Sequence, residues 1–188
     1  MVNFREKMLS FRHLCYKNGY LFAAFLIPVI LMGIAYISFG IYPFGGRSVL
    51  SLDLNAQYVF YFDYVHDVIG NGESLMYSWS RNLSGEFMGI IGYYLASPFN
   101  ILVWIFPRSM ITEGLLTMML AKFGACGVTF ALFAHKSQKL SKTTAALFAP
   151  MYALCAYMIV QTMDPMWLDC VLSLIHISEP TRQEAISY

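Results

Sequence analysis

Long apolar stretches dominate the pattern of hydrophobic and polar positions along this chain. Residues 19–42 carry no charge and are dominated by Leu, Ile, Phe and Ala. Residues 113–134 and 143–163 form two further stretches, and Lys122 is the one charge well inside them. A helix needs about 20 consecutive apolar residues to cross the hydrocarbon of a bilayer. The pattern therefore predicts an all-α, polytopic membrane protein with three membrane-spanning helices.

Residues 89–106 form a fourth apolar stretch with a different pattern. Ser97-Pro98 and Asn100 interrupt it and leave pieces shorter than the roughly 17 residues that a span needs. We expect this segment to lie in, or dip into, the outer face of the membrane. A complete crossing is the alternative, and it would reverse the side on which every later segment lies.

The charges beside these stretches predict their orientation. Residues 1–18 hold four basic residues and one acidic residue, and the short loop 135–142 holds three lysines. Basic loops tend to stay in the cytoplasm, so we expect the N-terminus and loop 135–142 to be cytoplasmic. Loop 43–112, with five acidic and three basic residues, is then external. The short acidic segment that follows residue 163 is external by the same rule.

The composition excludes several classes of protein. The chain of 188 residues is 58% apolar and 12% charged, whereas soluble domains are about 45–50% apolar and about 25% charged. A net charge of +1 argues against a nucleic-acid partner. The four cysteines form no Cys-x-x-Cys pair, which argues against a zinc site or a disulfide scaffold. These observations favour a membrane protein.

The external loop carries an amphipathic segment at residues 51–68. Its large apolar side chains recur at helical spacing, at Leu54, Tyr58, Phe62 and Val65. Such a helix is expected to lie on the membrane with its aromatic face down. Asp53 stands near its start, where a carboxylate usually accepts hydrogen bonds from free backbone N–H groups. Helix capping is therefore the simplest role for Asp53.

Two groups of charged side chains point to more specific chemistry, each with a plainer alternative. Asp63 and Asp67 lie four residues apart beside His66 and could hold a divalent cation through oxygen ligands. The alternative is a solvated helix face. Lys122 lies in the middle of a predicted span, where a charge is costly. It either faces a lipid phosphate in a cavity, or it snorkels to the surface or pairs with a carboxylate on a neighbouring helix.

A series of short motifs follows in a characteristic order along the chain. They are Tyr42-Pro43-Phe44-Gly45, Asp53-Leu54, Gln57-Tyr58, Asn71-Gly72, Tyr77-Ser78, Tyr93-Tyr94, Ser97-Pro98-Phe99-Asn100, Lys122 and Met166-Trp167-Leu168-Asp169. No single motif is specific, but their order and spacing together resemble the N-terminal part of the YfhO family of bacterial membrane proteins. The resemblance covers most of residues 20–171.

This resemblance implies a fold, a location and a reaction. The family resembles GT-C glycosyltransferases, which take sugar from a polyprenyl-phosphate carrier at the outer face of the bacterial cell membrane. The acceptor would be a cell-envelope polymer such as lipoteichoic acid. The resemblance assigns catalytic roles, as base or metal-associated carboxylates, to Asp53 and Asp169. Lys122, Gln57 and Tyr58 would bind the substrate, membrane lipids would be partners, and a divalent cation is a further expectation.

Two other function classes stay open, namely a multi-span transporter or lipid-handling protein without catalysis, and a structural membrane scaffold. An inverted repeat of these spans would favour a transporter, whereas further acidic external loops would favour the enzyme.

Residues 172–188 depart abruptly from the family pattern. The string that begins Leu172-Ser173 and ends in Ile186-Ser187-Tyr188 resembles a translated sequencing adapter. We therefore expect the chain to be a fragment of a longer gene product, and His176, Glu179 and Glu184 to have no role.

Overall fold

The computed structural model describes residues 4–72, 74–79 and 85–173, with side chains from Asn18 onward. Within these residues the fold is almost entirely helical, and the two described strands are two residues long each. The predicted all-α class is confirmed. Residues 174–188, most of the predicted adapter-derived tail, lie outside the described part of the chain.

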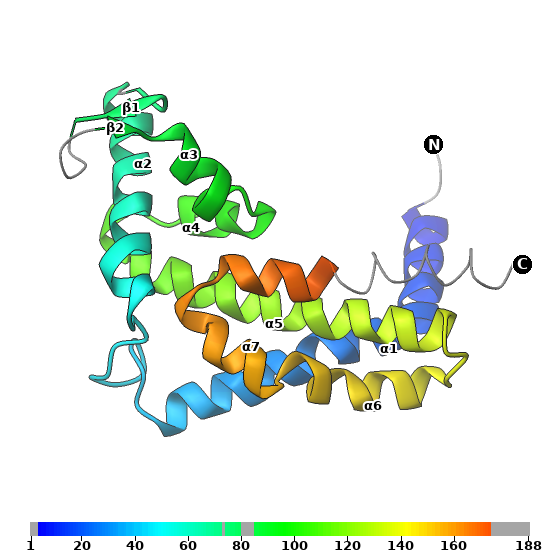
Figure 1. Ribbon diagram of the computed structural model, residues 1–188. Helices are drawn as coiled ribbons and strands as arrows, with labels where there is room; N and C mark the ends of the chain where they lie inside the picture. Colours follow the sequence, from blue (N-terminus) through cyan, green and yellow to red (C-terminus); the bar gives the residue numbers. More distant parts are fainter. Residues whose placement is uncertain (1–3, 73, 80–84, 174–188) are drawn as a thin grey trace, which may run out of the picture.

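Three long helices form a bundle in which each contacts the other two (Figure 1): α1 (Phe4–Ser38), α5 (Ile111–Lys136) and α6 (Lys142–Ala153). Small side chains line part of their contact, including Ala24, Ala131, Ala145 and Ala149. Small residues let helix backbones approach closely, which is how membrane helices commonly associate.

Two described helices are long and apolar enough to cross a membrane. They are Asn18–Ser38 within α1 and Arg108–Lys136, which comprises η4 (Arg108–Met110) and α5. The segment Asn18–Ser38 ends before Tyr42, where the apolar stretch itself ends, because Gly40 adopts a left-handed backbone conformation with φ of 62°. Glycine is the residue that adopts this conformation at least cost.

The third predicted span is built from two pieces. Helix α6 begins at Lys142, where Ser141 caps the amide of Thr144. It is followed by α7 (Ala156–Val160) and the 3-10 turn η5 (Gln161–Met163), after a bend of 46°. A last described helix, residues 166–173, returns along α5 (Figure 1). Its Leu168 and Leu172 pack in one cluster with Phe123.

Residues 88–105 form a sharply bent pair of helical segments. The first comprises α3 (Met88–Ile90) and η2 (Ile91–Leu95), and the second η3 (Pro98–Asn100) and α4 (Ile101–Ile105). They meet at 96°. Ser97 is extended, with ψ of 133°, because proline disfavours the helical conformation in the residue before it. The Ser97-Pro98 interruption is therefore where the chain turns, and this geometry fits either a broken span or a re-entrant loop.

The remaining elements form a compact layer at one end of the bundle (Figure 1): η1 (Leu54–Tyr58), α2 (Val59–Asn71) and the antiparallel pair β1 (Tyr77–Ser78) and β2 (Gly85–Glu86). The predicted apolar face is buried as a set, at Leu54, Tyr58, Phe62 and Val65. It packs in one cluster with side chains of α3, η2, α4 and α5, including Ile90, Leu95, Val103 and Leu115. The expectation that this face lies on lipid was wrong, because protein covers it.

Candidate functional site

Two carboxylates from segments that are far apart in the sequence meet beside the helix bundle. Asp53 precedes η1, and Asp164 follows η5 at the far end of the chain. Their carboxylates lie close enough for Asp53 to raise the pKa of Asp164. Asp53 makes no capping hydrogen bond to the described backbone. A capping residue normally has an extended conformation, whereas Asp53 is already helical, with φ of −65° and ψ of −28°. The predicted capping role of Asp53 is therefore wrong.

The pKa of Asp164 reflects the nearness of Asp53. Partial burial raises the pKa of Asp164, and the nearby Asp53 carboxylate raises it further. This is the behaviour of neighbouring carboxylates, where the ionisation of one opposes that of the other. Asp164 is therefore the member of the pair that holds a proton more readily than an ordinary Asp side chain does.

Tyr58 lies next to this pair and is 1% exposed. Its hydroxyl has no hydrogen-bond partner of good geometry within the described residues, although the Met166 amide lies nearby. Burial raises the pKa of Tyr58, and Asp164, Tyr94 and Asp53 contribute in the same direction. The rings of Tyr58 and Tyr94 meet edge to face at 5.4 Å. A buried hydroxyl without a partner costs free energy, so a ligand oxygen near the two carboxylates would find a donor here.

Gln57 lies at the edge of the buried face of this helical turn and is half-buried. Its Oε1 accepts a hydrogen bond from the Tyr61 hydroxyl at 3.4 Å. Both residues line a cavity of about 650 Å³, together with Phe60, Tyr64 and Phe87. Gln57 and Tyr58 were both expected to bind substrate. Gln57 faces this cavity, whereas Tyr58 is buried beside the acidic pair.

Lys122 is buried in the middle of α5 with two protein partners. Its Nζ donates to the carbonyl of Pro165 at 2.8 Å and to Oδ2 of Asp169 at 3.0 Å. It also lies 5.9 Å from the centre of the Phe99 ring. Among the explanations that the sequence left open, the partner carboxylate on a neighbouring segment is the one observed.

The resemblance assigns a catalytic role to Asp169 as well as to Asp53, but Asp164 is the carboxylate next to Asp53. The carboxylate of Asp169 pairs with Lys122 and lines an apolar cavity of about 490 Å³. This cavity lies between residues 92–99, α5 and the last described helix, and Tyr94, Phe99, Thr129 and Met166 also line it. The sequence signal that favours Asp164 is its position directly after the apolar stretch and before Pro165.

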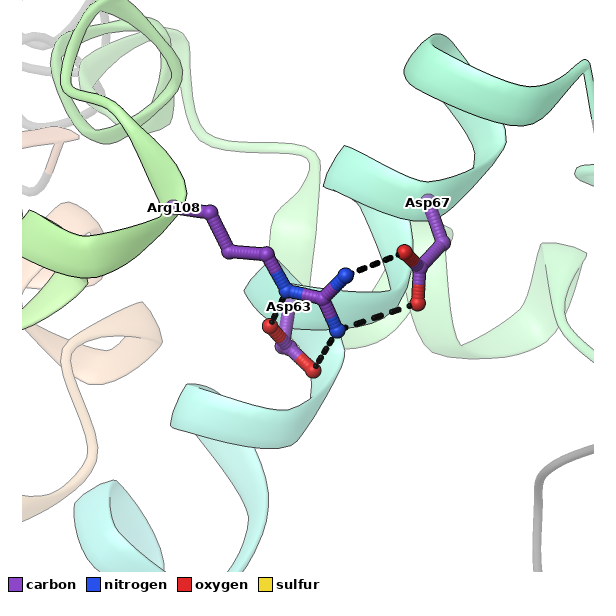
Figure 2. Close-up of polar contacts among 3 residues, drawn as sticks. All are labelled: Asp63, Asp67 and Arg108. Carbon is purple, nitrogen blue, oxygen red and sulfur yellow. Dashed lines mark hydrogen bonds and ion pairs between the residues drawn. The ribbon is translucent and has the colours of Figure 1, made fainter.

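The acidic pair Asp63 and Asp67 binds an arginine (Figure 2). Arg108, in the η4 turn that precedes α5, donates from both ends of its guanidinium to both carboxylates. Its Nη2 lies 2.6 Å from Asp63 and 3.2 Å from Asp67. The guanidinium thus takes the position between the two carboxylates that a cation would occupy. Across the described residues, no group of three or more His, Cys, Asp or Glu side chains is arranged to hold a metal ion.

The apolar helices define the class of this molecule. Within the described ranges, two helices are long enough to cross a bilayer, or four if each bent pair is one span. This is the architecture of a helical integral membrane protein. The chain belongs to the YfhO family of bacterial membrane proteins, because the family model described as "Bacterial membrane protein YfhO" matches residues 23–174. No curated protein and no solved structure gives a match to this chain.

The family match includes every residue of the candidate site, from Asp53 to Asp169. It also includes residues 172–174 of the segment expected to be foreign, and the rest of that segment falls outside the match.

Proposed function

We propose that this protein takes part in sugar transfer from a polyprenyl-phosphate carrier to a cell-envelope polymer at the outer face of the bacterial membrane. One observation carries the proposal: the close approach of the Asp53 and Asp164 carboxylates. The pair joins the two segments that the charge pattern predicts to be external. A carboxylate at the boundary between lipid and water can meet both a lipid-linked donor and a polymer hydroxyl.

Asp53 is the general base in this proposal. The acceptor hydroxyl attacks the anomeric carbon of the donor sugar, a new carbon–oxygen bond forms, and the bond to the carrier phosphate breaks. Polyprenyl phosphate leaves with the electron pair, and the hydroxyl proton passes to Asp53. A general base must lie within hydrogen-bond reach of the proton it accepts, and it contributes about 10²–10⁴-fold to the rate. Asp164 lies beside Asp53 and would help to orient it.

The apolar cavity beside Phe99 and Thr129 supports a lipid substrate. It has about 490 Å³ of space and lies against the membrane helix α5. Part of an isoprenoid chain would fill it. This feature also supports the alternative class, a lipid-handling protein that binds the carrier without catalysis.

A divalent cation is compatible with the same carboxylates. Mg²⁺ is commonly bound by one or two carboxylates together with substrate phosphates, and Asp53 and Asp164 would supply them once both are ionised, with Asp53 then acting as a metal-associated carboxylate rather than as the base. The chemistry that such an ion supplies is neutralisation of the departing phosphate.

The experiment that tests the proposal measures transfer of radiolabelled glucose from polyprenyl-phosphate-glucose to envelope polymer. The protein is expressed in bacterial membranes from its full gene, as the native sequence or with Asp53→Asn. Asparagine keeps the size of the side chain but accepts no proton. We expect normal expression and a loss of transfer of about 10²-fold or more.

Glu113→Gln is the matched control. Glu113 accepts a hydrogen bond from the Tyr42 hydroxyl at 2.7 Å, and an amide oxygen can accept the same bond, so transfer should be unchanged. Transfer by Asp53→Asn equal to that of the native protein would remove Asp53 from the reaction. Carrier binding without any transfer would overturn the enzymatic proposal and favour lipid handling.

A further inference from the structure

The buried ammonium of Lys122 contacts the turn that carries Asp164. Lys122 is 1% exposed, and a buried charge needs partners for its hydrogen atoms. Two of its three donors go to Pro165 and Asp169, which are the second and the last residues of the segment 164–169. The Phe99 ring lies near the same nitrogen. Both partners of Lys122 thus belong to one short segment that leads from η5 into the last described helix.

This segment has further hydrogen bonds that define its shape. The Asp164 amide donates to the Gln161 carbonyl at 3.1 Å, and the Asp164 carbonyl accepts from the Trp167 amide at 3.0 Å. The Pro165 carbonyl accepts from Leu168 at 3.2 Å as well as from Lys122. The proline ring also restricts the backbone dihedral φ of its own residue. Lys122 thereby links a well-defined turn to the middle of α5.

Asp164 lies directly before the carbonyl group that Lys122 binds. Its side chain reaches Asp53, and the neighbouring Met166 amide lies near the Tyr58 hydroxyl. A shift of the turn away from α5 would move Asp164 and Met166 together. The distance between Asp53 and Asp164 therefore depends on the contact between Lys122 and Pro165.

We propose that Lys122 is a positioning residue that holds the Asp164 turn against α5 and so keeps Asp164 in contact with Asp53. Lys122 itself touches neither sugar nor phosphate in this role. The expected effect of Lys122 on catalysis rests on the function proposed above. Its geometric part, the effect on the distance between Asp53 and Asp164, is independent of any reaction.

The geometric part is tested by cysteine cross-linking in the full-length gene product, with the native cysteines replaced by alanine. Asp53→Cys and Asp164→Cys together should form a disulfide readily under mild oxidation. The variant that removes the contact is Lys122→Met with Asp169→Asn, which leaves neither an unpaired ammonium nor an unpaired carboxylate. We expect this variant to lose most of the 53–164 cross-link.

A second cysteine pair serves as the control. Tyr77→Cys and Glu86→Cys lie directly opposite each other in the β1–β2 pair, away from the turn, and their cross-link should be retained in the Lys122 variant. An unchanged 53–164 cross-link in that variant would overturn the proposal. Loss of both cross-links would also overturn it, because Lys122 would then support the whole fold rather than the position of Asp164.

Transfer kinetics separate this role from phosphate binding. Loss of a positioning residue should lower kcat, by about 10²-fold for a displacement near 1 Å, and leave KM for polyprenyl-phosphate-glucose unchanged. Loss of a residue that binds the carrier equally well in the ground state and in the transition state would instead raise KM at constant kcat. That result would overturn the proposal. If native protein transfers no sugar while the cross-link depends on Lys122, the proposed reaction fails and the positioning role stands.

Discussion

Gly127 of α5 lies directly against the backbone carbonyl of Ala24 in α1. A Cβ atom added to Gly127 would stand 2.1 Å from that oxygen and 3.2 Å from the ring of Pro28. The two helices therefore meet at a distance that only glycine allows. Gly124, one turn away, faces the Phe25 ring in the same interface.

Gly127→Ala should separate α1 from α5 and destabilise the protein. The obstacle is backbone rather than a flexible side chain, so relief requires a helix movement, and overpacking of this kind typically costs about 1–3 kcal/mol. The measurement is thermal unfolding in detergent. Gly33→Ala is the control, because its added Cβ would meet no described atom within 4 Å and alanine favours the helix by about 0.8–1.0 kcal/mol. Equal melting temperatures for Gly127→Ala and the native protein would contradict the observed contact.

Arg108→Gln should loosen α2 from the start of α5. Without the guanidinium, Asp63 and Asp67 face each other one helical turn apart with like charges, which destabilises a helix. Hydrogen exchange of the α2 amides should become faster in the variant. The difference from the native protein should shrink in 1 M salt, because about half of the Arg108 side chain is exposed and salt screens exposed charges.

Arg47→Gln is the matched control for this effect. Arg47 is exposed and forms no ion pair within the described part of the chain, so its removal should leave α2 exchange unchanged. Arg108→Lys should give an intermediate result, since an ammonium group cannot reproduce the forked contact. If the α2 amides of Arg108→Gln exchange at the native rate, the contact does not stabilise α2.

Asp164→Asn should change how stability depends on pH. The pKa of Asp164 is raised in the folded state, by partial burial and then by Asp53, so the native state binds the proton more tightly than the unfolded state. Native stability then falls as pH rises from the ordinary pKa of Asp through the raised value. Asparagine does not ionise, so the melting temperature of the variant relative to native protein should increase from pH 4 to pH 7. A constant difference across this range would show that Asp164 does not titrate against Asp53.

Membrane topology is tested by single cysteines and an impermeant thiol reagent added to intact cells. The basic residues before Gly19 and in loop 135–142 predict that positions 63 and 164 are labelled and position 139 is not. Labelling at position 139 would reverse the predicted orientation and make residues 89–106 a complete span.

The helical architecture follows closely from the apolar pattern. The features that this pattern predicts correctly depend on residues that are close together in the sequence. The buried face of Leu54, Tyr58, Phe62 and Val65 is readable from spacing alone, because side chains four or three residues apart lie on one side of a helix. The turn at Ser97 is readable because Pro98 follows it. Periodicity reveals that an apolar face exists, but not whether lipid or protein covers it.

The polar pairs of the site carry no comparable local signal. Asp53 meets Asp164, Arg108 meets Asp63, and both pairs join residues that are far apart in sequence. Charge counts place such residues on one side of the membrane without selecting partners. That is why the motif positions gave a catalytic role to Asp169 and not to Asp164. It is also why Asp63 and Asp67 suggested a bound cation rather than an ion pair with an arginine.

Helix α5 makes a charged contact with each of the two segments that build the acidic pair. Arg108, one turn before its start, binds α2, which continues from η1 and Asp53, and Lys122 binds the turn that carries Asp164. The positions of both carboxylates are thus set relative to the same helix. A movement of α5 within the bilayer would therefore carry both carboxylates together.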